Sequence, residues 1–102
     1  MNNKLIELAE KEIIRKNILE VLEECGDEGA SEELISKCVS RAGIKCDTES
    51  IKKECEYLKG KGLVNINHVD NKVLGISRNI MTITSAGIDI LDGTNEVEGV
   101  GG

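Results

Sequence analysis

The sequence predicts a mainly α-helical domain with a small antiparallel β-hairpin, in the order helix, helix, helix, hairpin, closing helix. Three observations predict this fold class. Apolar residues recur at helical spacing over the first 60 residues, and two strand-like runs separated by a turn signal follow them. The chain has 102 residues, 39% of them hydrophobic, which is enough for one core made almost wholly of aliphatic side chains. We therefore expect one domain over residues 1–93 and a flexible, acidic, glycine-rich tail over residues 94–102.

The first helix is expected over residues 4–25, a run without helix breakers that Gly26 then ends. It has two apolar stripes. The stripe that faces the core consists of Ile14, Ile18, Val21, Leu22 and Cys25. The other stripe, rotated around the helix from the first, consists of Leu5, Ile6, Ala9 and Ile13. The second stripe either wraps the same core after a bend or docks on a second copy of the chain, and the latter predicts a homodimer through the first helix.

Two shorter helices are expected over residues 31–43 and 47–60, with Ser31 and Asp47 as their N-caps. The expected buried stripe of the first consists of Leu34, Ile35, Cys38, Val39 and Ala42. The expected buried stripe of the second consists of Ile51, Cys55 and Leu58. Two short helices that are joined by about four residues and follow a longer helix are typical of a helix-turn-helix.

The outer face of the third helix is the candidate DNA-binding surface. In a helix-turn-helix this face enters the major groove, where Lys can reach guanine or phosphate and Glu can accept from cytosine. Its charged residues also form two i, i+4 pairs, Glu49 with Lys53 and Lys52 with Glu56, which are typical of a solvated helix and leave the face formally neutral. Together with basic side chains nearby and on the hairpin, the candidate DNA-binding residues are Thr48, Glu49, Ser50, Lys52, Lys53, Lys45, Arg41, Lys72 and Arg78.

A hairpin is expected over residues 63–83 and a closing helix over residues 84–92. Val64, Ile66 and His68 alternate with asparagines as in a half-buried strand, and the run 80–83 is β-branched enough to be the second strand. Residues 73–79 are expected to form a loop or an irregular return between them. We interpret His68 as a strand-edge residue in preference to a pH-sensitive contact. For the closing helix, the expected caps are Thr84 or Ser85, and the expected inward residues are Ile88 and Leu91.

No catalytic, metal or cofactor site is expected. The four cysteines, Cys25, Cys38, Cys46 and Cys55, include no Cys-x-x-Cys pair and fit small buried hydrophobes better than zinc ligands. The sequence has no phosphate-binding glycine loop and no nucleophile with an identifiable base nearby, so we do not expect an enzyme. The start of the chain lacks the apolar run of a signal peptide, and no stretch is long enough to span a bilayer, which predicts a cytoplasmic protein with reduced thiols.

Two segments resemble winged-helix regulators. Residues 57–64, YLKGKGLV, resemble the end of a recognition helix that runs into the first strand of the wing, and residues 83–91, ITSAGIDIL, resemble the return from the wing into a closing helix. Nearly the whole chain, including GTNEVEGV at residues 93–100, is also similar to small conserved proteins of Mu-like phages and prophages. In that family a Pro usually precedes the final Gly-Val, where this chain has Glu98, and a Leu usually stands at the position of Ile83. These resemblances imply a winged helix-turn-helix fold and a viral or prophage setting, but no reaction.

Two functions are compatible with the sequence. The first is sequence-specific binding of double-stranded DNA by a small transcriptional regulator of the phage or prophage type. The second is a protein–protein interaction module for phage assembly or host interaction, with the stripe on the first helix as its interface. The net charge of −6 excludes strong long-range attraction to phosphates, so any DNA binding must depend on local geometry.

Overall fold

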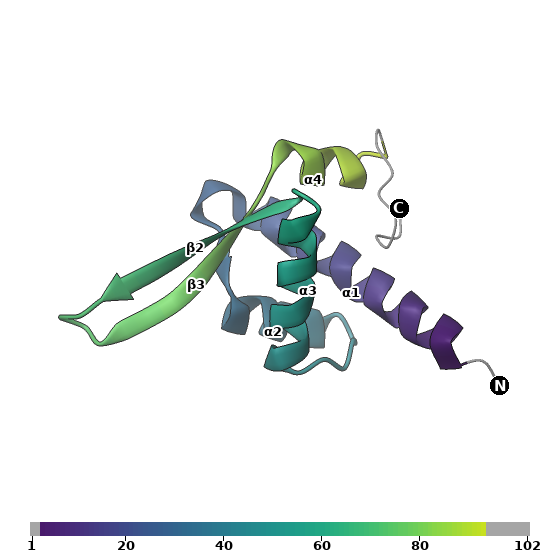
Figure 1. The fold of residues 1–102 in the computed structure, drawn as a ribbon, viewed down its shortest axis with the longest axis horizontal. Coiled ribbons are helices and arrows are strands. Elements are labelled where there is room, and N and C mark those ends of the chain that lie inside the picture. The colour runs from purple at the N-terminus through teal and green to yellow at the C-terminus, as the bar shows by residue number, and fades with distance from the viewer. Residues whose placement is uncertain (1–2, 94–102) are drawn as a thin grey trace.

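The structure is a computed structural model that describes residues 3–93, so the predicted tail at 94–102 lies outside the described residues. Four α-helices and a small antiparallel sheet form one core (Figure 1). The elements in chain order are α1 (Asn3–Cys25), the 3₁₀ helix η1 (Gly26–Glu28), β1 (Ala30–Ser31), α2 (Glu32–Arg41), α3 (Thr48–Gly60), β2 (Val64–Asn71), β3 (Ile76–Ile83) and α4 (Ser85–Leu91). This order confirms the predicted fold class.

The helices begin at polar caps. The Ser31 hydroxyl accepts from the Leu34 N–H at 3.2 Å, and the Asp47 carboxylate accepts from the Ser50 N–H at 2.8 Å. The Thr84 hydroxyl accepts from the Gly87 N–H at 3.1 Å, which decides between the two caps that the sequence offered for α4. Each cap satisfies a backbone donor that the helix itself leaves unpaired.

The sheet has three strands in the order β1-β3-β2, all antiparallel. We call the β2–β3 hairpin the wing. Strand β1 was not predicted, because two residues are too few to show a strand pattern. The prediction of a loop or irregular return over residues 73–79 is wrong, since β3 already begins at Ile76 and pairs with β2 along its whole length. Gly29 brings β1 to β3: it has a φ of +68°, and a Cβ there would overlap the Met81 carbonyl oxygen.

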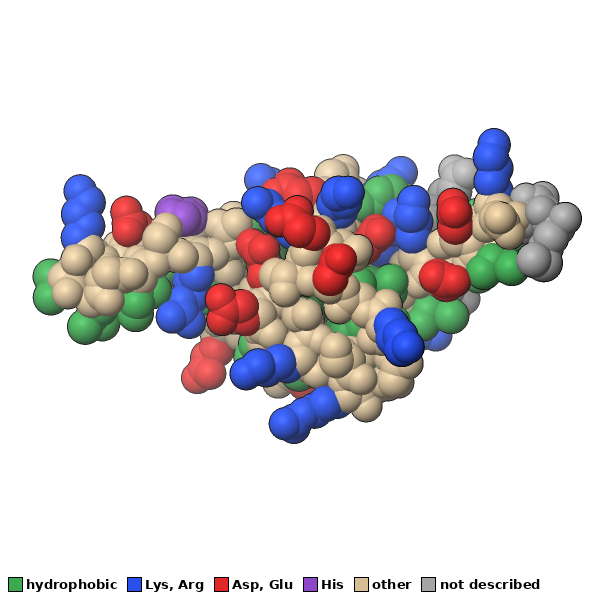
Figure 2. Space-filling model, turned by 90° about the horizontal axis from the view of Figure 1, so that it is seen from below, with side chains coloured by type: hydrophobic (Ala, Val, Ile, Leu, Met, Phe, Trp, Pro, Cys, Tyr) green, Lys and Arg blue, Asp and Glu red, His purple; other side chains and the backbone are tan. Residues whose placement is uncertain are grey.

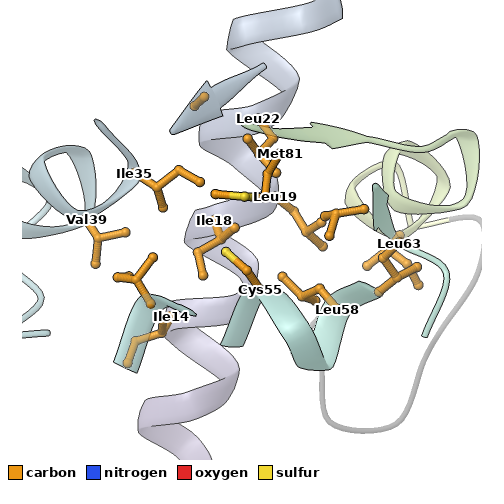
Figure 3. Close-up of a cluster of buried hydrophobic side chains, with 14 residues drawn as sticks. Ile14, Ile18, Leu19, Leu22, Ile35, Val39, Cys55, Leu58, Leu63 and Met81 are labelled. Carbon is orange, nitrogen blue, oxygen red and sulfur yellow. The ribbon is translucent and has the colours of Figure 1, made fainter. Parts of the chain in front are cut away.

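The core lies where α1, α2, α3, α4 and the base of the wing meet (Figure 3). Most residues of the expected core-facing stripes are buried or half-buried, but three of them are not. Leu34, Ala42 and Ile88 are exposed, because they lie on the flanks of short helices that cover the core with one face only. Leu19 and Ile90 are buried in addition.

A charged pair is also buried. Arg15 on α1 donates from Nε to Glu54 Oε1 on α3 at 2.8 Å, and the two side chains are 9% and 10% exposed. The Arg15 guanidinium lies 3.6 Å from the centroid of the Tyr57 ring. These contacts fix α3 on α1, and the sequence analysis did not predict them.

The first half of α1 extends away from the rest of the domain (Figure 1). Leu5, Ile6 and Ile13 are 66%, 50% and 55% exposed, and Ala9 is exposed as well. The expectation that this stripe wraps the core of the same chain is therefore wrong. An apolar surface remains on α1 that the described part of this chain does not cover.

Candidate nucleic-acid interface

The outer face of α3 is presented to solvent as predicted. Ile51, Cys55 and Leu58 are buried on the inner side of the helix, and this fixes its rotation. Four of the predicted contact residues on this helix, Thr48, Glu49, Lys52 and Lys53, are exposed. Ser50 is half-buried, and its backbone N–H is engaged by the Asp47 cap. This bond to the Ser50 N–H is the main reason why the pKa of Asp47 is lowered.

The wing and the starts of α2 and α3 enclose a cleft of about 370 Å³. One wall consists of residues 75–79 of the wing, and the other consists of Thr48 and residues 31–33. The cleft therefore brings together Thr48 and Arg78, two predicted contact residues that are 30 positions apart in the sequence. Arg41 and Lys45 are exposed outside the cleft, around the turn between α2 and α3, and Lys72 is exposed at the far end of the wing.

The cleft also contains acidic groups that the sequence analysis did not place there. Glu32 and Glu33 lie in the first turn of α2, where the helix dipole accounts for them, and both line the cleft. Figure 2 shows acidic and basic side chains interspersed over the middle of the molecule. The face seen in Figure 2 is therefore mixed in charge, and its basic side chains do not form one continuous patch.

Hydrogen bonds fix the wing to the helix-turn-helix. Asn79 Nδ2 on β3 donates to Glu32 Oε1 on α2 at 3.0 Å. His68 on β2 bonds to Asn79 Oδ1 through Nδ1 at 3.0 Å, and its Nε2 lies 3.1 Å from the Ser77 hydroxyl. His68 is exposed at the edge of a strand, as interpreted from the sequence. These hydrogen bonds tie the wing to the start of α2, and the sequence pattern does not show them.

The cysteine side chains are all thiols. Burial raises the pKa of Cys55 to about 12 and also raises those of Cys25 and Cys46, so these groups are poor thiolate ligands. Among residues 3–93, no three His, Cys, Asp or Glu side chains are grouped closely enough to hold a metal ion. No helix within the same range is both long and apolar enough to cross a bilayer.

Comparison with solved structures identifies the architecture. The chain is similar to a PadR-like transcription factor from Bacteroides fragilis, with a TM-score of 0.75, 18% identity and coverage of 89% of this chain and 84% of that chain. It is also similar to a PadR family transcription regulator from Clostridium difficile R20291, with a TM-score of 0.68, 18% identity and coverage of 79% and 81%. The chain has a winged helix-turn-helix fold.

A third similar structure is a PadR family transcriptional regulator from Eggerthella lenta, with a TM-score of 0.62, 16% identity and coverage of 90% and 80%. No protein-family model and no curated protein matches the sequence. In this winged helix, α3 occupies the place of the recognition helix and the β2–β3 hairpin that of the wing.

Proposed function

We propose that this winged helix is a transcriptional regulator that binds double-stranded DNA in a sequence-specific manner. The observation on which the proposal depends is the exposed outer face of α3 beside the cleft under the wing. The solved proteins with the same fold are named transcription regulators, which supports the same role for this chain.

The proposed contacts follow from the chemistry of each side chain. Thr48, Ser50, Lys52 and Lys53 contact base edges in the major groove, and Glu49 accepts from a cytosine amino group. The phosphate contacts around them are made by Arg41 and Lys45 from the turn, and by Lys72 and Arg78 from the wing. This set contains six basic residues and one acidic residue. Glu32 and Glu33 reduce unspecific attraction to phosphates, so affinity depends on the fit to a particular site.

The same proposal includes a homodimer through the exposed stripe of α1. Two copies that pack Leu5, Ile6, Ala9 and Ile13 together remove this apolar surface from water. Light scattering should give twice the 11.1 kDa of one chain. Ile6→Glu/Ile13→Glu should give the monomer mass, whereas Lys11→Glu on the opposite side of α1 should not. A wild-type monomer at micromolar concentration contradicts the dimer.

The biological setting rests on resemblance. The similarity to proteins of Mu-like phages and prophages supports a regulator of the phage or prophage type, acting in the cytoplasm. Transcription from promoters beside the gene should change when the protein is present, and this measurement tests the regulatory role.

A salt titration tests the binding mode. A duplex selected from a random library should bind with a log K that falls linearly with log salt, by about 0.9 per phosphate contact. Lys52→Ala/Lys53→Ala should weaken binding, and the slope should decrease by up to about 2 if both lysines also touch phosphate. Lys4→Ala/Lys11→Ala on α1 removes the same charge and should leave both quantities unchanged. Unchanged affinity of the Lys52/Lys53 variant at low salt refutes the role of α3.

One observation favours the second candidate function, a protein-interaction module. The outer face of α3 has the alternating charges of a solvated helix, whereas the stripe on α1 is apolar and exposed. Under this alternative, a pull-down recovers a specific protein through α1, and no duplex is selected from the library.

A further inference from the structure

The outer edge of β2 has no strand partner in the part of the chain that the structure describes. The sheet order is β1-β3-β2, so β3 has a neighbour on each side and β2 on one side only. The eight-residue strand β2 lies in the wing, which projects from the domain, and its residues 67–71 are all exposed (Figure 1). An exposed edge of this length is a template for pairing with another strand.

The hydrogen-bond register shows which backbone groups of β2 point outward. The Thr84 N–H donates to the Leu63 carbonyl at 3.0 Å, and these two residues lie one step beyond the first pair of the β2–β3 ladder. In an antiparallel ladder, hydrogen-bonded pairs alternate with pairs that are not hydrogen-bonded. The residues whose N–H and C=O groups face away from β3 are therefore Val64, Ile66, His68 and Asp70.

This edge lacks the features that usually prevent edge-to-edge pairing. Proteins commonly protect an edge strand with Pro, with Lys or with a β-bulge. β2 contains neither Pro nor Lys, and its pairing with β3 runs from Val64 to Asn71 without a bulge. Asp70 is its only Asp, Glu, Lys or Arg residue. Two such edges therefore repel each other little, although each chain has a net charge of −6.

A second copy of β2 matches this edge in length and register. In an antiparallel pair centred on Asn67, the outward residues of one copy meet outward residues of the other. Val64 lies opposite Asp70 of the second copy. Ile66 lies opposite His68 of the second copy. A pair centred one residue earlier or later would leave one outward residue outside the ladder. The register centred on Asn67 therefore forms the most backbone hydrogen bonds, and it places the two Asn67 side chains opposite each other across a two-fold axis.

The same register accounts for the exposed turn of the wing. Val73 and Leu74 are 94% and 67% exposed, although hairpin turns are usually built from polar residues and glycine. The Asn71 side-chain oxygen accepts from the Leu74 N–H at 3.1 Å and fixes this turn. With the pair centred on Asn67, the turn of one copy lies beside the residues that precede β2 in the other copy. Part of the apolar surface of the turn then leaves water.

We propose that two copies of this protein pair edge to edge through β2 and form one continuous antiparallel sheet in the order β1-β3-β2-β2-β3-β1. Each copy contributes only one strand and one turn, so the interface is small and the pairing is weak and reversible. This contact is separate from the proposed contact through α1 and can link two such dimers. The inference does not require that the protein binds DNA.

Sedimentation of the Ile6→Glu/Ile13→Glu variant isolates this contact, because the stripe on α1 is disrupted there. The mass should rise from 11.1 kDa toward twice that value as the concentration increases, with a dissociation constant on the order of 0.1–1 mM. At the micromolar concentration at which the stripe is tested, the wings stay apart. A monomer at every concentration up to about 2 mM overturns the inference.

Charges at position 67 test the register in the same background. Asn67→Lys and Asn67→Glu each place two like charges across the two-fold axis, so each variant should pair about fivefold more weakly. An equimolar mixture of the two should pair at least as well as the unsubstituted chain, because unlike charges then meet. Ser77→Lys and Ser77→Glu are the matched controls, since Ser77 is exposed on β3 and lies away from the axis. They should pair normally, alone or mixed.

The pattern of these results decides the matter. If both Asn67 variants pair as well as the unsubstituted chain, the copies associate through another surface and the inference is overturned. It is also overturned if the mixture pairs no better than either variant alone. Neither result bears on DNA binding or on the stripe of α1, which are tested by the selected duplex and by the mass at micromolar concentration.

Discussion

Replacing Glu54 by Gln should destabilise the domain far more than its conservative appearance suggests. Glu54 is one half of the buried pair with Arg15, whose two side chains are at most one-tenth exposed. Gln keeps the shape of the side chain but removes its charge. The buried Arg15 guanidinium, which also stacks on Tyr57 at 3.6 Å, then loses the carboxylate that accepts from its Nε.

The expected cost is about 3–5 kcal/mol, the usual range when one partner of a buried ion pair is removed. Domains of this size have a total stability of roughly 5–15 kcal/mol, so the variant should be marginal. A loss of about 3 kcal/mol corresponds to a decrease in Tm of roughly 12–24 °C in a domain of under 100 residues. By contrast, Arg15→Met/Glu54→Leu should lie within about 1 kcal/mol of the wild type or above it, since aliphatic residues can replace a buried pair.

Urea unfolding followed by circular dichroism at 222 nm measures these differences. The matched control is Glu56→Gln, an exposed change on the same helix, which should alter stability by less than about 0.5 kcal/mol. If Glu54→Gln is as mild as Glu56→Gln, the pair does not fix α3 on α1. If the double variant is as unstable as Glu54→Gln, the loss comes from packing and not from an uncompensated charge.

Three further predictions concern single positions. Gly29→Ala should destabilise the domain more than Gly43→Ala in the same urea assay. Both glycines have a positive φ, at which alanine costs about 1 kcal/mol, but only at Gly29 would the new methyl group overlap the backbone of Met81. Equal losses of stability would contradict the close approach of β1 to β3. Ionised Asp47 accepts from the Ser50 N–H, and its lowered pKa means that it stabilises the folded state above its ordinary value of 3.8 and loses this effect as the pH falls. Thermal melts at several pH values should therefore show a weaker acid destabilisation for Asp47→Asn than for the wild type, and identical pH profiles would exclude a stabilising role of the charge. Because burial raises the pKa of Cys55 to about 12, a thiol-reactive dye should label it only as the domain unfolds, and Cys55→Ala should leave the number of fast-reacting thiols unchanged.

The sequence predicted most of the fold because the fold is built from local signals. Ser31 and Asp47 each cap a helix whose apolar stripe follows at once, and Gly26 lies directly after α1. The features that sequence analysis missed depend on contacts between distant segments. Strand β1 is two residues long and exists only because β3 lies beside it, 50 positions away in the chain. In the sequence Arg15 is one of many charged residues, and its burial depends on contacts with the distant Glu54 and Tyr57.

In the candidate site, too, some features follow from the local sequence and others depend on contacts between distant segments. The outward direction of Lys52 and Lys53 follows from the burial of Ile51 and Cys55 and could be predicted by counting residues along the helix. The presence of Glu32 in the same cleft as Arg78 could not be predicted from the sequence, because it depends on how the wing lies against the start of α2. The sequence also did not show that Val73 and Leu74 are exposed to solvent, because apolar residues next to a turn can be either buried or exposed.

The continuity of α1 has a consequence for any operator. One unbroken helix of 23 residues, about 35 Å long, has the exposed apolar stripe at one end and contacts α3 through Arg15 near its middle. In the proposed dimer, this continuous helix would therefore set the angle and separation of the two α3 helices, because it contains no break at which they could adjust. We therefore expect the proposed dimer to tolerate only one spacing between DNA half-sites. In the proposed dimer, a single residue inserted between Ile13 and Ile14 should rotate the stripe by about 100° relative to the core in both copies, and should abolish binding to a palindromic site while each copy still folds.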